Sequence, residues 1–106
     1  PAGRVVVTII NDSPRELELL LLGPMARAVT VPDCKDCHFY NLIGGLFEPP
    51  CSSTGSRPRI TLTLASGAYH AVVLAKYDPI IKPFYARWRL KSGTRYSNCL
   101  YIAKGP

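Results

Sequence analysis

Four cysteines, Cys34, Cys37, Cys51 and Cys99, constrain what this chain can fold into more than any other feature. A structural zinc site usually takes its thiolates as two close pairs, and only one C-x2-C pair is present, so zinc is the less favoured interpretation. A thioredoxin-like redox pair would need its C-x2-C at the start of a helix in a βαβ unit, and the strand-like sequence around Cys34 does not offer one. The cysteines therefore predict two structural disulfides.

The pairing of the cysteines stays open, because four cysteines allow three connectivities. Our working hypothesis is that Cys34 and Cys37 both bond outside their own segment, one to Cys51 and the other to Cys99. Disulfides persist outside the reducing cytosol, and a chain that begins Pro1-Ala2-Gly3 suits the removal of a signal peptide. We therefore expect a secreted protein with no transmembrane segment, since no apolar run approaches the length of a membrane span.

The rest of the chain predicts short strands within one domain, residues 1–106. Ten prolines and eight glycines interrupt it closely, and β-branched or alternating runs lie between them. The expected strands cover residues 5–10, 16–22, 27–31, 59–64, 68–76, 84–90 and 95–102. We predict an all-β fold, an antiparallel β-sandwich or small barrel of six to seven strands stapled by disulfides. Residues 34–55 form a long cysteine-bearing loop.

Neighbouring runs are separated by turn residues, so we expect local pairing. Residues 5–10 and 16–22 predict a hairpin or a short corner, and residues 59–64 and 68–76 predict a second hairpin. Residues 84–90 and 95–102 predict a third hairpin across Lys91-Ser92-Gly93-Thr94.

The run 16–22 is apolar on both sides at its end. Leu17, Leu19 and Leu21 share one face, while Leu20 and Leu22 lie on the other. We favour cover within the domain for both faces. The alternative is an exposed patch that pairs with a second copy in a homodimer.

The chain offers no recognisable catalytic constellation. It has two histidines, no glycine-rich phosphate loop, no G-x-S-x-G and no H-E-x-x-H motif. His70 shares a strand face with Val72 and Leu74, which favours a partly buried structural residue. His38 lies beside Cys37 with Asp33 and Asp36 nearby, where a solvated loop is favoured over a metal site. We predict that the protein is not an enzyme and uses no cofactor or metal.

Basic residues follow the run 84–91 with the period of a strand. The core set is Phe84, Ala86, Trp88 and Leu90. The exposed set is Tyr85, Arg87, Arg89 and Lys91, which Arg95 would extend across the turn. With a net charge of +6, such a basic stripe attracts acidic proteins, lipid headgroups or anionic polysaccharides, and nucleic acid is less favoured because few aromatic residues are interspersed. The alternative is a charged face that only keeps the sheet soluble and blocks edge pairing.

Asn11-Asp12-Ser13 is an acceptor pattern for N-glycosylation at an expected turn, although Pro14 lowers its use.

Five motifs are distinctive, namely Pro83-Phe84, Trp88-Arg89-Leu90-Lys91-Ser92-Gly93, Tyr96-Ser97-Asn98-Cys99-Leu100-Tyr101-Ile102, Asp33-Cys34-Lys35-Asp36-Cys37 and Gly67-Ala68-Tyr69. Together they resemble a family of small secreted cysteine-containing proteins of filamentous fungi, including effector-like proteins of Trichoderma and of plant-pathogenic ascomycetes and basidiomycetes. The resemblance spans most of the chain. It implies a secreted β-rich protein that acts at a host or environmental interface without catalysis, with four structural cysteines and no active residues.

The sequence therefore favours a non-catalytic secreted binding protein, effector- or elicitor-like, at a fungus–host or fungus–microbe interface. Its partner would be an unidentified host or microbial surface component, met by the loop 34–55 and the basic stripe. One alternative is a cationic membrane-active or antimicrobial toxin. The other is a cell-wall polysaccharide-binding module in which Tyr40, Phe47 or Tyr85 serve as stacking platforms.

Overall fold

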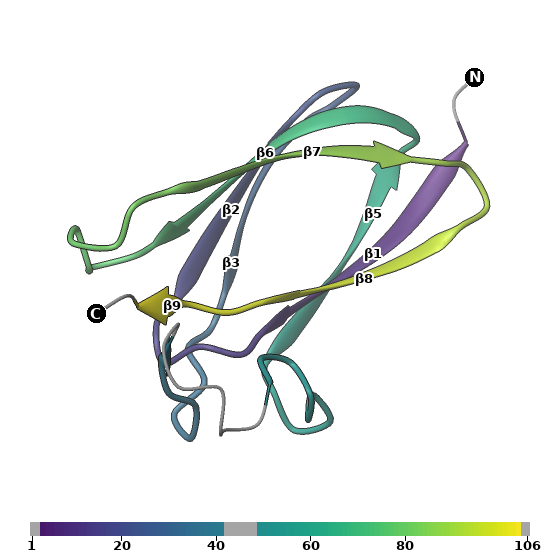
Figure 1. Cartoon of the computed structure of the whole chain (residues 1–106). Helices are drawn as coiled ribbons and strands as arrows, with labels where there is room; N and C mark the ends of the chain where they lie inside the picture. The colour runs from purple at the N-terminus through teal and green to yellow at the C-terminus, as the bar shows by residue number, and fades with distance from the viewer. Residues whose placement is uncertain (1–2, 42–48, 105–106) are drawn as a thin grey trace.

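The computed structural model describes residues 3–41 and 49–104, which form strands and, within these ranges, no helix (Figure 1). The longer strands are β1 (Arg4–Asn11), β2 (Leu17–Leu22), β3 (Ala26–Val31), β5 (Arg59–Ala65), β6 (Gly67–Ala75), β7 (Phe84–Leu90) and β8 (Arg95–Leu100). Two short strands, β4 (Tyr40–Asn41) and β9 (Ala103–Lys104), pair with each other. The prediction of a disulfide-stapled all-β fold is confirmed.

Two larger sheets lie face to face in a sandwich-like arrangement (Figure 1). The three-stranded sheet has the order β5-β1-β8, and the four-stranded sheet has the order β3-β2-β6-β7. All pairings are antiparallel except β1 with β8 and β4 with β9, which are parallel. The parallel pair arises because β8 returns from the four-stranded sheet to the far edge of β1.

The predicted hairpins of β5 with β6 and of β7 with β8 are wrong. For β1 and β2, where a hairpin or a short corner was expected, the structure has the corner. β1 and β2, β5 and β6, and β7 and β8 each lie in different sheets, while the hairpins present are β2–β3 and β6–β7. The β5–β6 corner depends on Gly67, whose φ of +139° is strained for other residues and whose Cβ would meet the Pro24 ring at 2.6 Å. A turn sequence that could close a hairpin therefore moves the chain to the opposite sheet.

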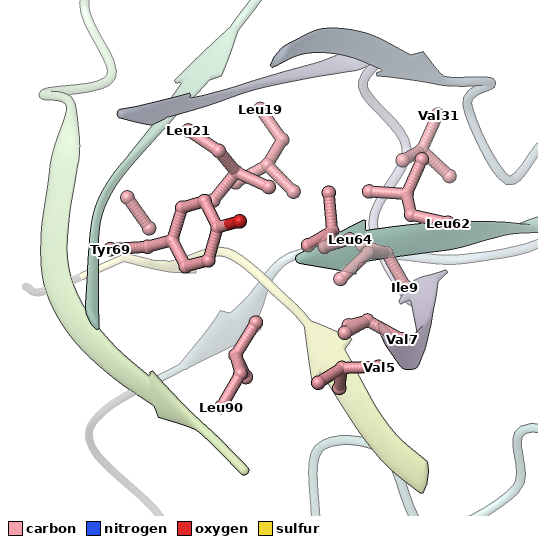
Figure 2. Packing of buried hydrophobic residues seen from close by; sticks show 11 residues of the cluster. Val5, Val7, Ile9, Leu19, Leu21, Val31, Leu62, Leu64, Tyr69 and Leu90 are labelled. Carbon is pink, nitrogen blue, oxygen red and sulfur yellow. The ribbon is translucent and has the colours of Figure 1, made fainter. Parts of the chain in front are cut away.

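The core fills the space between the inner faces of the two sheets (Figure 2). The alternation predicted from the sequence places Val5, Val7 and Ile9 of β1 against the inward residues of the four-stranded sheet. Tyr69, 1% exposed, reaches into this core and donates its hydroxyl proton to the carbonyl of Ala65 at 2.7 Å. Its phenol group is thereby paired inside an apolar environment.

Strand β2 shows both of the faces that its sequence implied. Leu17, Leu19 and Leu21 are buried between the sheets, as the favoured internal explanation requires. On the outer face Leu20 is half-buried and Leu22 is 59% exposed. The expectation that both faces are covered within the domain is therefore wrong for Leu22, and the homodimer stays a prediction.

Candidate functional site

Strand β7 positions the predicted basic stripe. Period two turns Tyr85, Arg87 and Arg89 to the outer face of the four-stranded sheet, where all three are exposed. Leu90 is buried and Trp88 packs against the core from the inner face, as expected. Phe84 was predicted to be core, but 61% of its surface is exposed. It lies at the start of β7, away from the connection at residues 91–94 from which β7 and β8 diverge (Figure 1). An exposed aromatic ring therefore lies next to the basic stripe, on the opposite face of the strand.

His70 lies beside this stripe. It pairs with Arg87 across the β6–β7 ladder and with Leu22 across the β2–β6 ladder. It shares its face with Val72 and Leu74 as predicted, but this is the outer face and His70 is exposed, so the expectation of a partly buried histidine is wrong. The outer face consequently combines aliphatic side chains with the basic stripe.

Arg95 does not extend the stripe on the same face. It is the first residue of β8, which belongs to the three-stranded sheet, and it lies on the outer surface of that sheet. Lys91 lies in the connection between the two sheets, where its backbone N–H donates to the Tyr96 hydroxyl at 2.9 Å. The predicted residues are therefore brought together around one edge of the sandwich rather than along one face.

The charge of the chain is segregated along its length. Residues 1–78 carry seven basic and seven acidic residues and are neutral, while residues 79–106 carry six basic residues and no acidic one. The six are Lys82, Arg87, Arg89, Lys91, Arg95 and Lys104, and each is exposed. None of them forms an ion pair with a described acidic residue. The sequence contains this signal, but Lys82 and Lys104 lie outside the period-two pattern of residues 84–91 and were not predicted as part of the stripe.

The three aromatic residues proposed as stacking platforms have different outcomes. Tyr85 is 70% exposed and stays available. Tyr40 is half-buried, and its hydroxyl donates to the Asp12 carboxylate at 2.5 Å while its ring packs edge-on against Tyr101. Phe47 lies outside the described residues. Tyr40 is therefore a structural residue, and the platform prediction is wrong for it.

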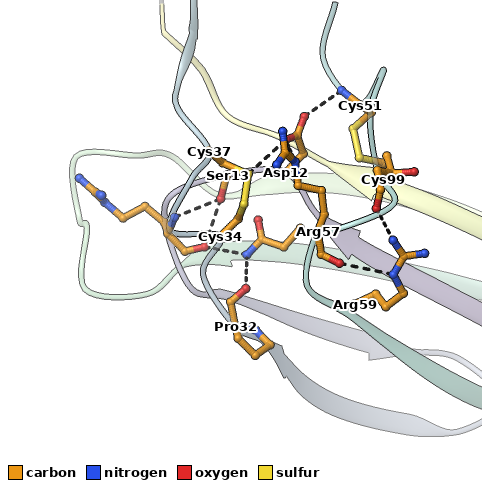
Figure 3. The surroundings of a disulfide bond; sticks show 12 residues. Asp12, Ser13, Pro32, Cys34, Cys37, Cys51, Arg57, Arg59 and Cys99 are labelled. Atoms are coloured by element: carbon orange, nitrogen blue, oxygen red, sulfur yellow. Dashed lines mark hydrogen bonds and ion pairs between the residues drawn. A yellow bond between two sulfur atoms is a disulfide. The ribbon is translucent and has the colours of Figure 1, made fainter.

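The disulfides are confirmed, but the pairing hypothesis is wrong. Cys34 bonds to Cys37, and Cys51 bonds to Cys99 (Figure 3). The Cα atoms of the first pair are 5.3 Å apart, a distance that the short turn between them allows. Of the two bridges, it is the second that ties the cysteine-bearing loop to β8. In the loop 34–55, the described residues 34–41 and 49–55 contain only β4 as regular structure.

Asp12 organises the end of the sandwich that holds the disulfides. It is 2% exposed, and its carboxylate accepts hydrogen bonds from the Arg57 Nε at 2.9 Å and from the Cys51 backbone N–H at 2.8 Å (Figure 3). Tyr40 supplies a third donor. One buried carboxylate therefore joins β1 to three segments that are distant in sequence.

The expected glycosylation site is also part of this buried end. Asn11 is fully buried, and its side-chain amide donates to the carbonyls of Arg15 and Pro32 at 2.8 and 2.9 Å. An acceptor asparagine must be exposed to carry a glycan. The sequence pattern is therefore a structural turn and not a modification site in the folded protein.

No metal-binding chemistry follows from the described acidic, cysteine and histidine groups. One cluster has suitable composition, since ligand atoms of Asp12, Cys51 and Cys99 lie within 4.8 Å of one another. The two sulfur atoms are bonded to each other, and the carboxylate already accepts from Arg57. The cluster is thus a structural joint. His38 is exposed, and its ring lies tilted by 47° against that of Tyr40, with the ring centroids 5.1 Å apart.

Comparison with known proteins does not assign a family. No protein-family model matches the chain, and no curated protein matches it. Among solved structures it is similar to a leucine-rich repeat protein from Bacteroides thetaiotaomicron VPI-5482, with 11% identity and a TM-score of 0.42. The match covers 94% of this chain but only 12% of that chain. A likeness of this degree carries no argument about function.

Within the described residues, no helix is long and apolar enough to cross a bilayer.

Proposed function

We propose that this chain is a non-catalytic, disulfide-stabilised binding protein that acts outside the reducing cytosol and recognises an anionic component of a host or microbial surface. The effector- or elicitor-like role and secretion belong to this proposal. The observation that carries it is the segregation of charge, because six exposed basic residues and no acidic residue lie in residues 79–106. The basic edge is defined as these six residues.

The segregation supports binding rather than solubility alone. Charges that only keep a protein soluble can be spread over its surface. Here the basic residues of residues 1–78 are balanced by acidic ones, with three described ion pairs between them, and the whole excess positive charge lies in residues 79–106. Charges on one edge add to a common positive potential that attracts anionic partners. The guanidinium groups of Arg87 and Arg89 also fit carboxylate, sulfate or phosphate groups in a bidentate way.

Chromatography on immobilised polyanions tests this proposal. We expect retention on polygalacturonate, heparin and polyglutamate, and elution of the variant Arg87→Glu/Arg89→Glu at much lower salt. The matched control is Lys35→Glu/Arg59→Glu, which changes the net charge equally at exposed residues of the neutral part, since Arg59 lies opposite Ile10, at the end of β1 away from Arg95. Equal loss of retention in both variants would contradict the proposal, because it would mean that only net charge matters.

A second candidate function, the cationic membrane-active toxin, draws support from the aliphatic residues beside the stripe. Leu22 and Tyr85 are exposed on the same sheet face as Arg87. An apolar patch with adjacent basic residues suits the surface of an anionic membrane. Leakage of vesicles that contain anionic lipid, reduced by Leu22→Ser, would favour this candidate, and intact vesicles would remove it.

A further inference from the structure

Strands β7 and β8 are both sheet edges on the same side of the sandwich. In the described part of the chain, β7 pairs with β6 and β8 pairs with β1, and neither has a partner on its other side. The two strands follow each other in sequence and diverge from the connection at residues 91–94 (Figure 1). An unpaired edge presents backbone N–H and C=O groups that can accept another strand.

Two clefts follow these edges. The first, of about 260 Å³, lies towards the connection at residues 91–94 and is lined by Arg87–Leu90 of β7, by Tyr96–Asn98 of β8 and by Val7. The second, of about 450 Å³, lies at the other end of the two strands, where β7 begins and β8 ends, and is lined by residues 98–103 on one side. β8 contributes Tyr96–Asn98 to the smaller cleft and Asn98–Leu100 to the larger one. Its side away from β1 has no strand partner among the described residues, so this unpaired edge borders both clefts.

The far wall of the larger cleft is mostly apolar. It is formed by Val73 and Ala75 of β6, by Leu17 of β2, by Phe84 at the start of β7 and by Ile81 and Lys82 of the connection before it. Phe84 has 61% of its surface exposed there. Side chains entering from an added strand would thus meet aliphatic and aromatic groups, as the core side of any strand does.

We propose that this cleft binds an extended peptide segment that adds to the edge of β8 as a further strand, with apolar residues facing inward and acidic residues facing outward. Lys82 lines the larger cleft, and Arg87 and Arg89 line the smaller cleft further along β8. All three are exposed and lack described ion-pair partners, so acidic side chains of a strand that runs along β8 from the larger cleft to the smaller one would meet them. This inference deepens the proposed function and rests on it for the attraction of an anionic partner.

The exposed backbone edge favours a peptide over an anionic lipid. An acyl chain would fill the apolar part of the cleft, but it would cover the outward N–H and C=O groups of β8 without giving them hydrogen bonds. A peptide strand supplies those bonds along its length, as in other cases of strand addition. Alternate side chains would then select for apolar residues on one side only.

Titration with a capped octapeptide in which valine alternates with glutamate tests the inference. We expect binding by calorimetry and slower amide hydrogen exchange in β8. The same peptide with an N-methyl group on every backbone amide should bind at least tenfold more weakly, because neither of its edges can then donate hydrogen bonds to β8. Equal binding of the N-methylated peptide, or of a peptide with its four valines and four glutamates in separate blocks, would overturn the inference.

Adjacent aromatic residues give a matched pair of variants. Phe84→Ala should weaken peptide binding about tenfold, whereas Tyr85→Ala should leave it unchanged, because the two exposed rings lie on opposite faces of β7. Phe84→Ala should keep its retention on polyanions, which separates this inference from the proposed function. Binding that depends on Tyr85 instead, or binding of laurate but no peptide, would overturn it.

Discussion

The two disulfides are expected to differ in what they contribute to stability. Cys51–Cys99 has a sequence separation of 48, and Cys34–Cys37 has a separation of 3. In the chain-entropy model, closing the longer loop removes enough freedom from the unfolded chain to stabilise the fold by about 4 kcal/mol, and the shorter one by about 2 kcal/mol. A domain of this size has a total of roughly 5–15 kcal/mol, so loss of the longer bridge removes a large share.

The perturbation is a pair of double variants, Cys51→Ser/Cys99→Ser and Cys34→Ser/Cys37→Ser. Urea unfolding at neutral pH without reductant should give a free energy of unfolding about 4 kcal/mol below the parent for the first and about 2 kcal/mol for the second. The first variant should also show a larger dependence on urea, because its unfolded chain is more expanded. Reduction of the parent should approach the sum of both losses.

Three results would refute this reasoning. The first is an equal loss for both variants, which would mean that loop length does not set the contribution of the bridges. The second is a larger loss for the local bridge, which would place its role in native packing around Cys34, since this residue is only 5% exposed. An unchanged urea dependence in Cys51→Ser/Cys99→Ser would remove the entropic explanation as well.

Three further predictions concern single residues. Asp12→Asn should lower the free energy of unfolding by about 3 kcal/mol, because Arg57, whose side chain is 20% exposed, keeps its charge without a carboxylate; a double-mutant cycle with Arg57→Met that finds no coupling would contradict this. Gly67→Ala should cost about 2 kcal/mol by urea unfolding, whereas Gly55→Ala, with open space at the Cβ position, should change stability by less than about 0.5 kcal/mol. Burial raises the pKa of Tyr69 above its usual value of 10.0, so stability that is fully present below pH 10 should be lost as pH rises through the folded pKa. In urea unfolding above pH 10, the free energy of unfolding of Tyr69→Phe should fall less steeply with pH than that of the parent, and equal slopes would contradict this. The hydrogen bond with Glu16 raises the pKa of Lys76, but Lys76 is present in both proteins and does not affect the comparison.

The strands could be predicted from the sequence because alternation is a local property. Val5, Val7 and Ile9 alternate with more exposed residues, and burial follows that alternation in the structure. The pairing of strands could not be predicted in the same way. Ala65-Ser66-Gly67 has the composition of a hairpin turn, yet Gly67 adopts a φ of +139° and directs β6 into the opposite sheet. The choice depends on the packing of both sheets, which no local window contains.

The buried polar end could not be found from the sequence for a related physical reason. Asn11-Asp12-Ser13 has the composition of a solvated turn, and single residues of these types are usually exposed. Asp12 is buried because Tyr40, Cys51 and Arg57 supply donors to its carboxylate once the fold has formed. The disulfide pairing belongs to the same assembly, since Cys51, whose backbone N–H donates to Asp12, bonds to Cys99 of β8, the strand that pairs with β1.

The charges on the basic edge oppose the self-association that the unpaired sheet edges would otherwise favour. A sandwich with two unpaired edges on one side is prone to pair with its own copies, and natural proteins counter this with charged residues at the edge. Arg87, Arg89 and Arg95 line both edges here, so two copies approaching through this side would repel each other. An acidic strand would be attracted by the same residues. Protection against self-association and selection of an acidic partner are therefore not competing interpretations, because one set of charges produces both.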